Sequence, residues 1–333
     1  MTALSVLDLV MIGEGQDLAD AIDASRQLAR HVEQHGYARY WIAEHHDMPG
    51  IGSAATALII GELAAATTSI RVGAGGIMLP NHSPLVVAEP FGTLDALHPG
   101  RIDLGLGRAP GGAGPTVQAL RRGAPERDFA QDVVEVMDYL ADNGRQPVRG
   151  APGRHDVPLW ILGSSLYGAD LAAALGLPYA FASHFAPRHL DQAIAHYRRN
   201  FRPSAHLAQP YVMIGANIFV ADSNAEAEYL ASSHLQWMTD LHVGRMGLLP
   251  RPREGYLAGL PAHERAVLDQ VLACTVAGDK ATVGTWIRDL VARTGADELM
   301  IDCRIHDPQA RLRSHQYAAE ALGDLLTRPV AGS

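Results

Sequence analysis

Short apolar segments alternate with longer segments of helical spacing along most of the chain. The apolar segments predict strands over residues 4–11, 40–44, 70–79, 101–107, 158–162, 179–183, 212–220 and 298–302. Apolar residues at intervals of three or four predict helices over 20–34, 84–97, 129–140, 169–175, 187–199, 224–237 and 312–326, and a further one that Ser53 caps and that runs through Ala66. Eight strand–helix units predict an α/β fold, a closed parallel TIM (β/α)8 barrel, over an open sheet.

The segment between the seventh and eighth predicted strands is longer than a simple crossover needs. Residues 240–277 are first rich in proline and glycine and then helical, so we expect an insertion or lid there. A single (β/α) barrel routinely takes ~250 residues. We therefore predict one domain over residues 1–333, with an insertion at about 240–277.

Composition narrows the class of protein. A hydrophobic fraction of 47% supplies a packed core, and a formal net charge of -9 gives no basic surface for nucleic acid or an anionic membrane. No apolar run approaches the ~18 residues of a membrane span. Cys274 and Cys303 are too few for a disulfide framework. We expect a cytoplasmic protein that acts on a small molecule.

Candidate site residues follow the predicted strands at their carboxyl ends, where TIM barrels carry their active sites. Glu44 and His45 follow the second strand, and Arg108 follows the fourth. The fifth strand runs into Gly163, Ser164 and Ser165, directly before a predicted helix. Such a strand-to-helix turn binds anions through free N–H groups and the positive helix end, although an ordinary serine N-cap has the same sequence. Arg108 is either a phosphate ligand or a surface arginine.

Glycines gather inside the third predicted strand. Gly73, Gly75 and Gly76 occupy three of four positions. Glycine within a strand indicates a bulge or a place where a flat ligand approaches the backbone, and the alternative is a tightly packed interior layer of the barrel.

A metal site is a further alternative for the carboxyl end of the barrel. His46, His82, His184 and Asp302 all follow predicted strands, and histidine and carboxylate groups bind zinc. Their spacing follows no recognised ligand motif, and a metallohydrolase of this kind would contain zinc and no yellow chromophore.

Three segments together resemble the bacterial luciferase-like flavin-dependent monooxygenase family. They are 43–46 (AEHH), 71–82 (RVGAGGIMLPNH) and 101–111 (RIDLGLGRAPG). The resemblance runs from the first strand to about residue 183, with weaker agreement in the last barrel unit. It implies a luciferase-like TIM barrel, usually a homodimer, that binds FMN or, in relatives, the deazaflavin F420.

The resemblance also implies roles for the candidate residues. Gly75-Gly76 resembles the pair that forms a bulge behind the flavin ring, often with a non-prolyl cis peptide. By their positions in the sequence, Arg108, Gly163, Ser164 and Ser165 resemble the residues of the family's phosphate site. His45 is similar to the active-site acid/base, with Glu44 as its neighbour in the pocket. Luciferases proper have a reactive cysteine at the position of Gly107, so light emission is not implied.

The activity implied is oxygenation of a small organic substrate by O2 and reduced FMN, through a C4a-peroxyflavin. No NAD(P)-binding fingerprint is visible in the sequence, so a separate flavin reductase is expected to deliver the reduced FMN. Two other functions stay open: an F420-dependent oxidoreductase of the same fold, and a flavin-binding barrel without catalytic activity.

Overall fold

Eight parallel strands close into a barrel in the computed structural model, which describes residues 2–109, 114–120 and 128–323. The barrel strands are β1 (Ala3–Asp8), β2 (Arg39–Ile42), β3 (Arg71–Met78), β4 (Ile102–Gly107), β5 (Leu159–Gly163), β6 (Tyr179–Phe181), β7 (Val212–Val220) and β9 (Glu298–Asp302). Each pairs in parallel with its neighbour, and β9 closes the ring by pairing with both β1 and β7. The predicted fold class is confirmed.

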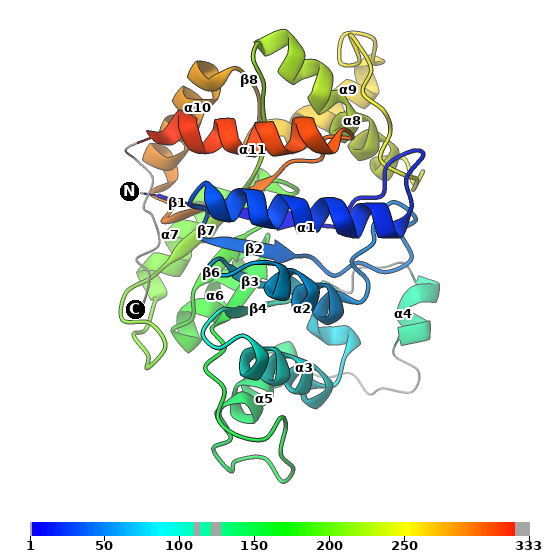
Figure 1. The fold of residues 1–333 in the computed structure, drawn as a ribbon. Helices are drawn as coiled ribbons and strands as arrows, with labels where there is room; N and C mark the ends of the chain where they lie inside the picture. The colour runs from blue at the N-terminus through cyan, green and yellow to red at the C-terminus, as the bar shows by residue number, and fades with distance from the viewer. Residues whose placement is uncertain (1, 110–113, 121–127, 324–333) are drawn as a thin grey trace.

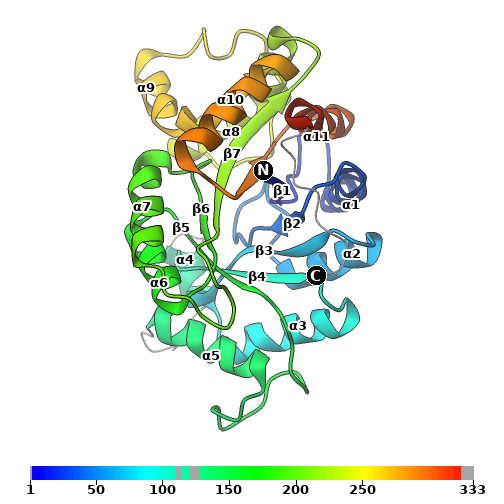
Figure 2. The ribbon, with the colours of Figure 1, turned by 90° about the vertical axis from the view of Figure 1, so that its left-hand side faces the viewer.

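Helices cover the outside of the barrel, on both sides of the strands in Figure 2 and across the front in Figure 1. They are α1 (Leu18–Gln34), α2 (Thr56–Ala66), α3 (Pro84–Leu97), α5 (Phe129–Ala141), α6 (Leu166–Leu175), α7 (Leu190–Asn200), α10 (Lys280–Thr294) and α11 (Pro308–Leu322), whereas α4 (Gly114–Leu120) stands apart from them in Figure 1. Short 3-10 helices η1 (Leu79–Asn81) and η2 (Pro187–His189) follow β3 and precede α7. The apolar faces of the α-helices that cover the barrel pack on the outer side of the strands, where most of the core lies.

The starts of α2 and α11 differ from the sequence prediction, and the hydrogen bonds of nearby side chains explain why. Ser53 does not cap α2, since its hydroxyl donates to the carbonyl of Ala43 and the helix begins three residues later. The last helix begins at Pro308, before the predicted start at 312, because the Asp307 side chain accepts a hydrogen bond from the N–H of Ala310.

An insertion lies between the seventh and eighth barrel strands, as predicted. It contains the end of α8 (Asn224–His242), then α9 (Ala262–Val271), the 3-10 helix η3 (Leu272–Cys274) and a strand, β8 (Thr275–Gly278), that the sequence analysis does not predict. β8 pairs with the last four residues of β7, and of these only Asn217 also pairs with β9. The extra strand therefore lies outside the barrel ring, and the prediction of one domain stays a prediction.

An ion-pair network fills the amino-terminal end of the barrel. Arg39 donates to Asp103 on β4 at 2.8 Å and to Glu298 on β9 at 3.1 Å, so one guanidinium joins strands on different sides of the ring. Arg71 donates to the other oxygen of Asp103 at 2.9 Å, and Tyr211 donates to Glu298 at 2.9 Å. The network fixes this end of the barrel and leaves the opposite end for chemistry.

Among the helices in the described ranges, none combines the length and the apolar character that crossing a membrane requires.

Candidate functional site

The glycine-rich strand β3 contains the bulge that the family resemblance implies. The peptide bond between Gly75 and Gly76 is cis, and the register of β3 against β4 shifts between Gly75 and Ile77. A Cβ on Gly76 would lie 2.6 Å from the carbonyl oxygen of Gly105, and one on Gly73 would lie 2.4 Å from that of Asp103. The close packing of β3 on β4 therefore requires glycine at positions 73 and 76. This agrees with the alternative that the glycines belong to a tightly packed interior layer of the barrel. Whether a flavin ring lies against the bulge stays a prediction.

Glu44 stabilises the bulge from the end of β2. Its N–H donates to the carbonyl of Gly76 at 3.2 Å, and its Oε2 accepts from the N–H of Met78 at 2.7 Å. The carboxylate is buried, with 2% of the side chain exposed. Burial alone would raise the pKa of Glu44, but the hydrogen bonds from His82, Met78 and His46 lower it overall, so the group is a carboxylate at neutral pH.

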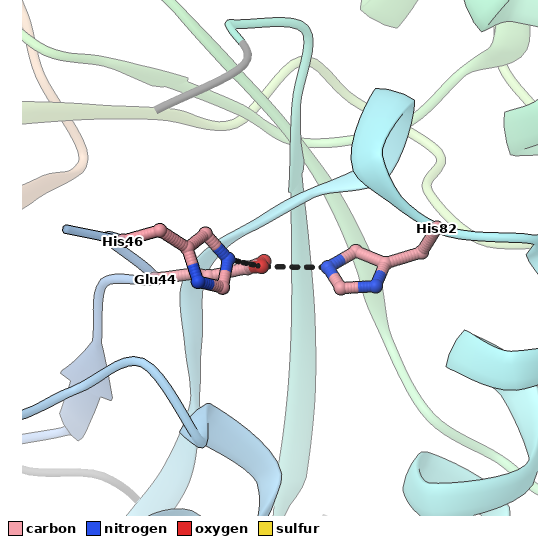
Figure 3. A group of neighbouring side chains, drawn as sticks. All are labelled: Glu44, His46 and His82. Atoms are coloured by element: carbon pink, nitrogen blue, oxygen red, sulfur yellow. Dashed lines mark hydrogen bonds and ion pairs between the residues drawn. The ribbon is translucent and has the colours of Figure 1, made fainter. Parts of the chain in front are cut away.

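Two histidines share the other oxygen of Glu44 (Figure 3). The Nε2 atoms of His46 and His82 each lie 2.6 Å from Glu44 Oε1, and the two rings approach that oxygen from either side. His46 alternates with Glu44 along an extended chain and so lies on the same side, whereas His82 comes from the residue after η1. Glu44, His46 and His82 form what we call the Glu44 cluster.

The metal set suggested by the sequence is not formed. His46 and His82 lie in the Glu44 cluster, whereas His184 and Asp302 lie in a second cluster with Arg304. The reason is strand order: His184 follows β6 and Asp302 ends β9, which flank β7, and β2 and β3 lie elsewhere in the ring.

His45 lies between Glu44 and His46 in sequence but is not among the three side chains whose ligand atoms meet in the Glu44 cluster. Its Nδ1 is buried and has no hydrogen-bond partner in the described part of the chain. Burial, with a smaller effect from the Arg304 guanidinium, lowers the pKa of His45 to about 4. The ring is therefore neutral at pH 7.

The second cluster is buried at the carboxyl end of β7 and β9. Arg304 donates to both oxygens of Asp302, at 3.0 and 2.6 Å, and its guanidinium carbon lies 4.5 Å from the centre of the Trp237 ring. Asn217 is the register partner of Asp302, and its Nδ2 donates to the carbonyl of His184 at 2.8 Å. Burial lowers the pKa of His184 to about 4.

Sequence reasoning missed Arg304 and Trp237. Arg304 lies two residues after a predicted barrel strand, which is a usable signal, since alternate residues of an extended chain share a side. Trp237, on α8, belongs to the apolar cluster inside the barrel. Nothing in its local sequence indicates that α8 packs there.

The predicted phosphate residues come together at the ends of β4 and β5. The Arg108 guanidinium carbon lies 4.2 Å from the centre of the Tyr167 ring, on the first turn of α6. Ser165 is the N-cap residue of α6, but among the described residues its hydroxyl makes no capping hydrogen bond. Gly163 leaves open space, because a Cβ there would meet no atom nearer than 3.8 Å, the Cα of Gly168.

This arrangement fits the phosphate group of FMN. The exposed Arg108 lies against the first turn of the ten-residue helix α6, and Ser164 and Ser165 directly precede the positive end of that helix. Helix N–H groups and arginine are the groups that bind phosphate in proteins. Ser165 makes no capping hydrogen bond among the described residues, so the ordinary serine cap does not account for it, and its role as a phosphate ligand stays a prediction.

Comparison with known proteins gives one family. The family model described as luciferase-like monooxygenase matches residues 3–298. A protein of Escherichia coli (strain K12), described as a luciferase-like monooxygenase, is 49% identical over 328 residues, which cover 97% of this chain and 98% of that protein.

Solved structures have the same fold. The crystal structure of apo-MsnO8 is 33% identical with a TM-score of 0.87, covering 98% of this chain and 100% of that one. The oxygenating constituent of a Pseudomonas putida 3,6-diketocamphane monooxygenase, solved with FMN, is 17% identical with a TM-score of 0.73, covering 99% and 100%. An F420-dependent secondary alcohol dehydrogenase, solved with an F420-acetone adduct, is 15% identical with a TM-score of 0.68, covering 97% and 99%.

Proposed function

The chain belongs to the luciferase-like monooxygenase family, and on that premise we propose that it is an FMN-dependent monooxygenase of a small organic substrate. The observation that carries the proposal is the meeting of Arg108 with the first turn of α6, beside Ser164 and Ser165. A site for a doubly charged phosphate fits FMN and distinguishes it from riboflavin.

The other residues have separate tasks in this proposal. Glu44 holds the Gly75-Gly76 bulge, against which the flavin ring lies. Reduced FMN, when bound, supplies the electrons that activate O2 for transfer of one oxygen atom to the substrate. His45 exchanges a proton with the reacting groups, because its Nδ1 has no hydrogen-bond partner in the described structure.

Buried apolar side chains around the carboxyl end of the barrel support a reaction that excludes water. Trp237, Met238 and Leu249 come from outside the barrel strands and pack in the same cluster as the interior residues Leu7 and Met300. A site with little water limits loss of the activated oxygen as hydrogen peroxide. We propose that a separate reductase supplies the reduced FMN. The homodimer and the cytoplasmic location stay predictions from the sequence.

Cofactor titration tests the proposal. Protein freed of flavin is titrated with FMN, riboflavin and F420, and binding is followed by quenching of the cofactor fluorescence. Arg108→Gln is expected to weaken FMN binding about tenfold, since a hydrogen bond to a charged group contributes about 1.5–3 kcal/mol and this guanidinium is exposed. Riboflavin, which has no phosphate, should bind the variant and the wild-type protein alike.

The control is Arg149→Gln, an exposed arginine on the connector before β5 that pairs only loosely with Asp142, at 3.9 Å. It should leave all three affinities unchanged. Equal weakening of FMN and riboflavin by Arg108→Gln would reject the phosphate contact. Tight binding of F420 without binding of FMN would replace the proposal by an F420-dependent oxidoreductase.

A further inference from the structure

We propose that Glu44, His46 and His82 form a binding site for a divalent transition metal of the Zn²⁺ class. The three side chains offer two imidazole nitrogens and one carboxylate oxygen, and these ligand atoms lie within 4.8 Å of one another. Two histidines and one carboxylate are a ligand set that Zn²⁺ and Co²⁺ bind in proteins. This site differs from the set suggested by the sequence, which combined His46 and His82 with residues of another cluster.

The distances require only a small rearrangement. Each histidine Nε2 now lies 2.6 Å from Glu44 Oε1. An ion about 2.0–2.2 Å from each donor holds tetrahedral donors roughly 3.4 Å apart, so each nitrogen must move away from the oxygen by less than about 1 Å. Side-chain rotation provides this movement, because both rings are at the surface, with 15% of His46 and 25% of His82 exposed.

The carboxylate is already oriented for a metal. Glu44 Oε2 accepts the hydrogen bond from the N–H of Met78 at 2.7 Å, which leaves Oε1 directed at the two histidines. A hydrogen bond of this kind to the second oxygen fixes a ligand carboxylate and favours metal binding. Three protein ligands leave a position for water, as in zinc sites that are open to solvent.

The protons balance in a simple way. A carboxylate oxygen only accepts, so each Nε2 carries the hydrogen when no ion is bound. A metal binds the Nε2 lone pair, so a neutral ring must move its hydrogen to Nδ1, and a ring that carries both hydrogens releases one proton to solvent. No electron transfer is needed. All three ligands come from protein side chains, so this inference does not rest on the proposed function.

Titration with Co²⁺ tests the site directly. The whole chain, freed of flavin and stripped of metal with a chelator, is titrated with Co²⁺, and binding is followed by the visible absorption of the ion. We expect saturable binding and its displacement by Zn²⁺. His46→Ala and His82→Ala, which remove ligands from different elements, should each weaken binding at least about tenfold.

The matched control is His35→Ala. His31 and His35 on α1 are another pair of neighbouring histidines in the described structure, with ring centres 4.4 Å apart, and they are not part of the Glu44 cluster. The control should bind Co²⁺ like the wild-type protein. Urea unfolding of each variant shows that it is folded, and Zn²⁺ should raise the melting temperature of the wild type but not of His82→Ala. The proposal is overturned by the absence of saturable binding, or by binding that His46→Ala and His82→Ala retain unchanged.

Discussion

Replacement of Arg39 by methionine should destabilise the barrel strongly. Methionine keeps much of the length of the side chain but removes the cation that joins Asp103 and Glu298 at the amino end of the barrel. Asp103 keeps its pair with Arg71. Glu298 keeps only hydroxyl donors such as Tyr211, since Arg39 is its one cationic partner among the described residues. A fully buried carboxylate is then left without a compensating charge.

The expected loss is about 3 kcal/mol of unfolding free energy. Removal of one partner from a buried ion pair costs about 3–5 kcal/mol, and the lower value applies because 17% of the Arg39 side chain is exposed. The ion-pair network also changes the pKa of Asp103. Burial alone would raise the pKa of Asp103, but Arg39 and Arg71 hold it below its usual value.

Urea unfolding followed by circular dichroism measures the loss. The matched control is Arg293→Met, because Arg293 pairs with Asp191 at 2.5 Å but at the surface, with exposed fractions of 48% and 64%. This control should lose less than about 1 kcal/mol. Removing both partners, in Arg39→Met with Glu298→Leu, should cost less than Arg39→Met alone. Equal losses in the buried and the surface variants would refute the reasoning.

Three further predictions concern the carboxyl end and the buried histidines. Burial lowers the pKa of His184 to about 4 and those of His234 and His315 to about 3, whereas the unfolded chain takes up these protons below about pH 6.5. The unfolding free energy should therefore fall as the pH drops from about 6.5 to about 4, by up to roughly 1.4 kcal/mol per pH unit for each histidine, and a urea midpoint that is constant over this range would contradict the assignment. His45→Ala should keep FMN but divert turnover from oxygenated product to hydrogen peroxide, measured as the ratio of the two; unchanged oxygenation would reject its role. Gly215→Ala would place a Cβ 2.1 Å from His184 Nδ1, so we expect a loss of about 1–3 kcal/mol in thermal unfolding, and an unchanged melting temperature would show that the ring moves freely.

The barrel was predictable because most positions of its strands are apolar and buried. β7 is buried at all nine positions, and its bounds and those of β9 match the prediction at both ends. Strands of this kind differ clearly from amphipathic helices in sequence. β8 was not predicted, since four residues carry no usable period and the strand forms only where the long β7 offers an edge.

α10 was missed although its signals are in the sequence. Asp279 caps its first turn through the N–H of Thr282, and Gly295 ends it with a positive φ of 60°. Val283, Ile287 and Leu290 recur at helical intervals and are buried.

Parts of the site followed from topology, and parts did not. The rule that barrel chemistry lies at the carboxyl ends of strands correctly indicated that Arg108 and the start of α6 are neighbours. The pairing of Glu44 with His82 joins residues from different strands, and only the three-dimensional register of β2 and β3 brings them together. The exact roles of these residues stay predictions.

The division of β7 into two halves separates closure of the barrel from variation of its rim. Residues 213–217 complete the ring with β9, and residues 217–220 hold β8. The chain carried on the outer half can therefore vary in length and sequence, as loops do on an immunoglobulin sandwich, while the ring beneath keeps its hydrogen bonds.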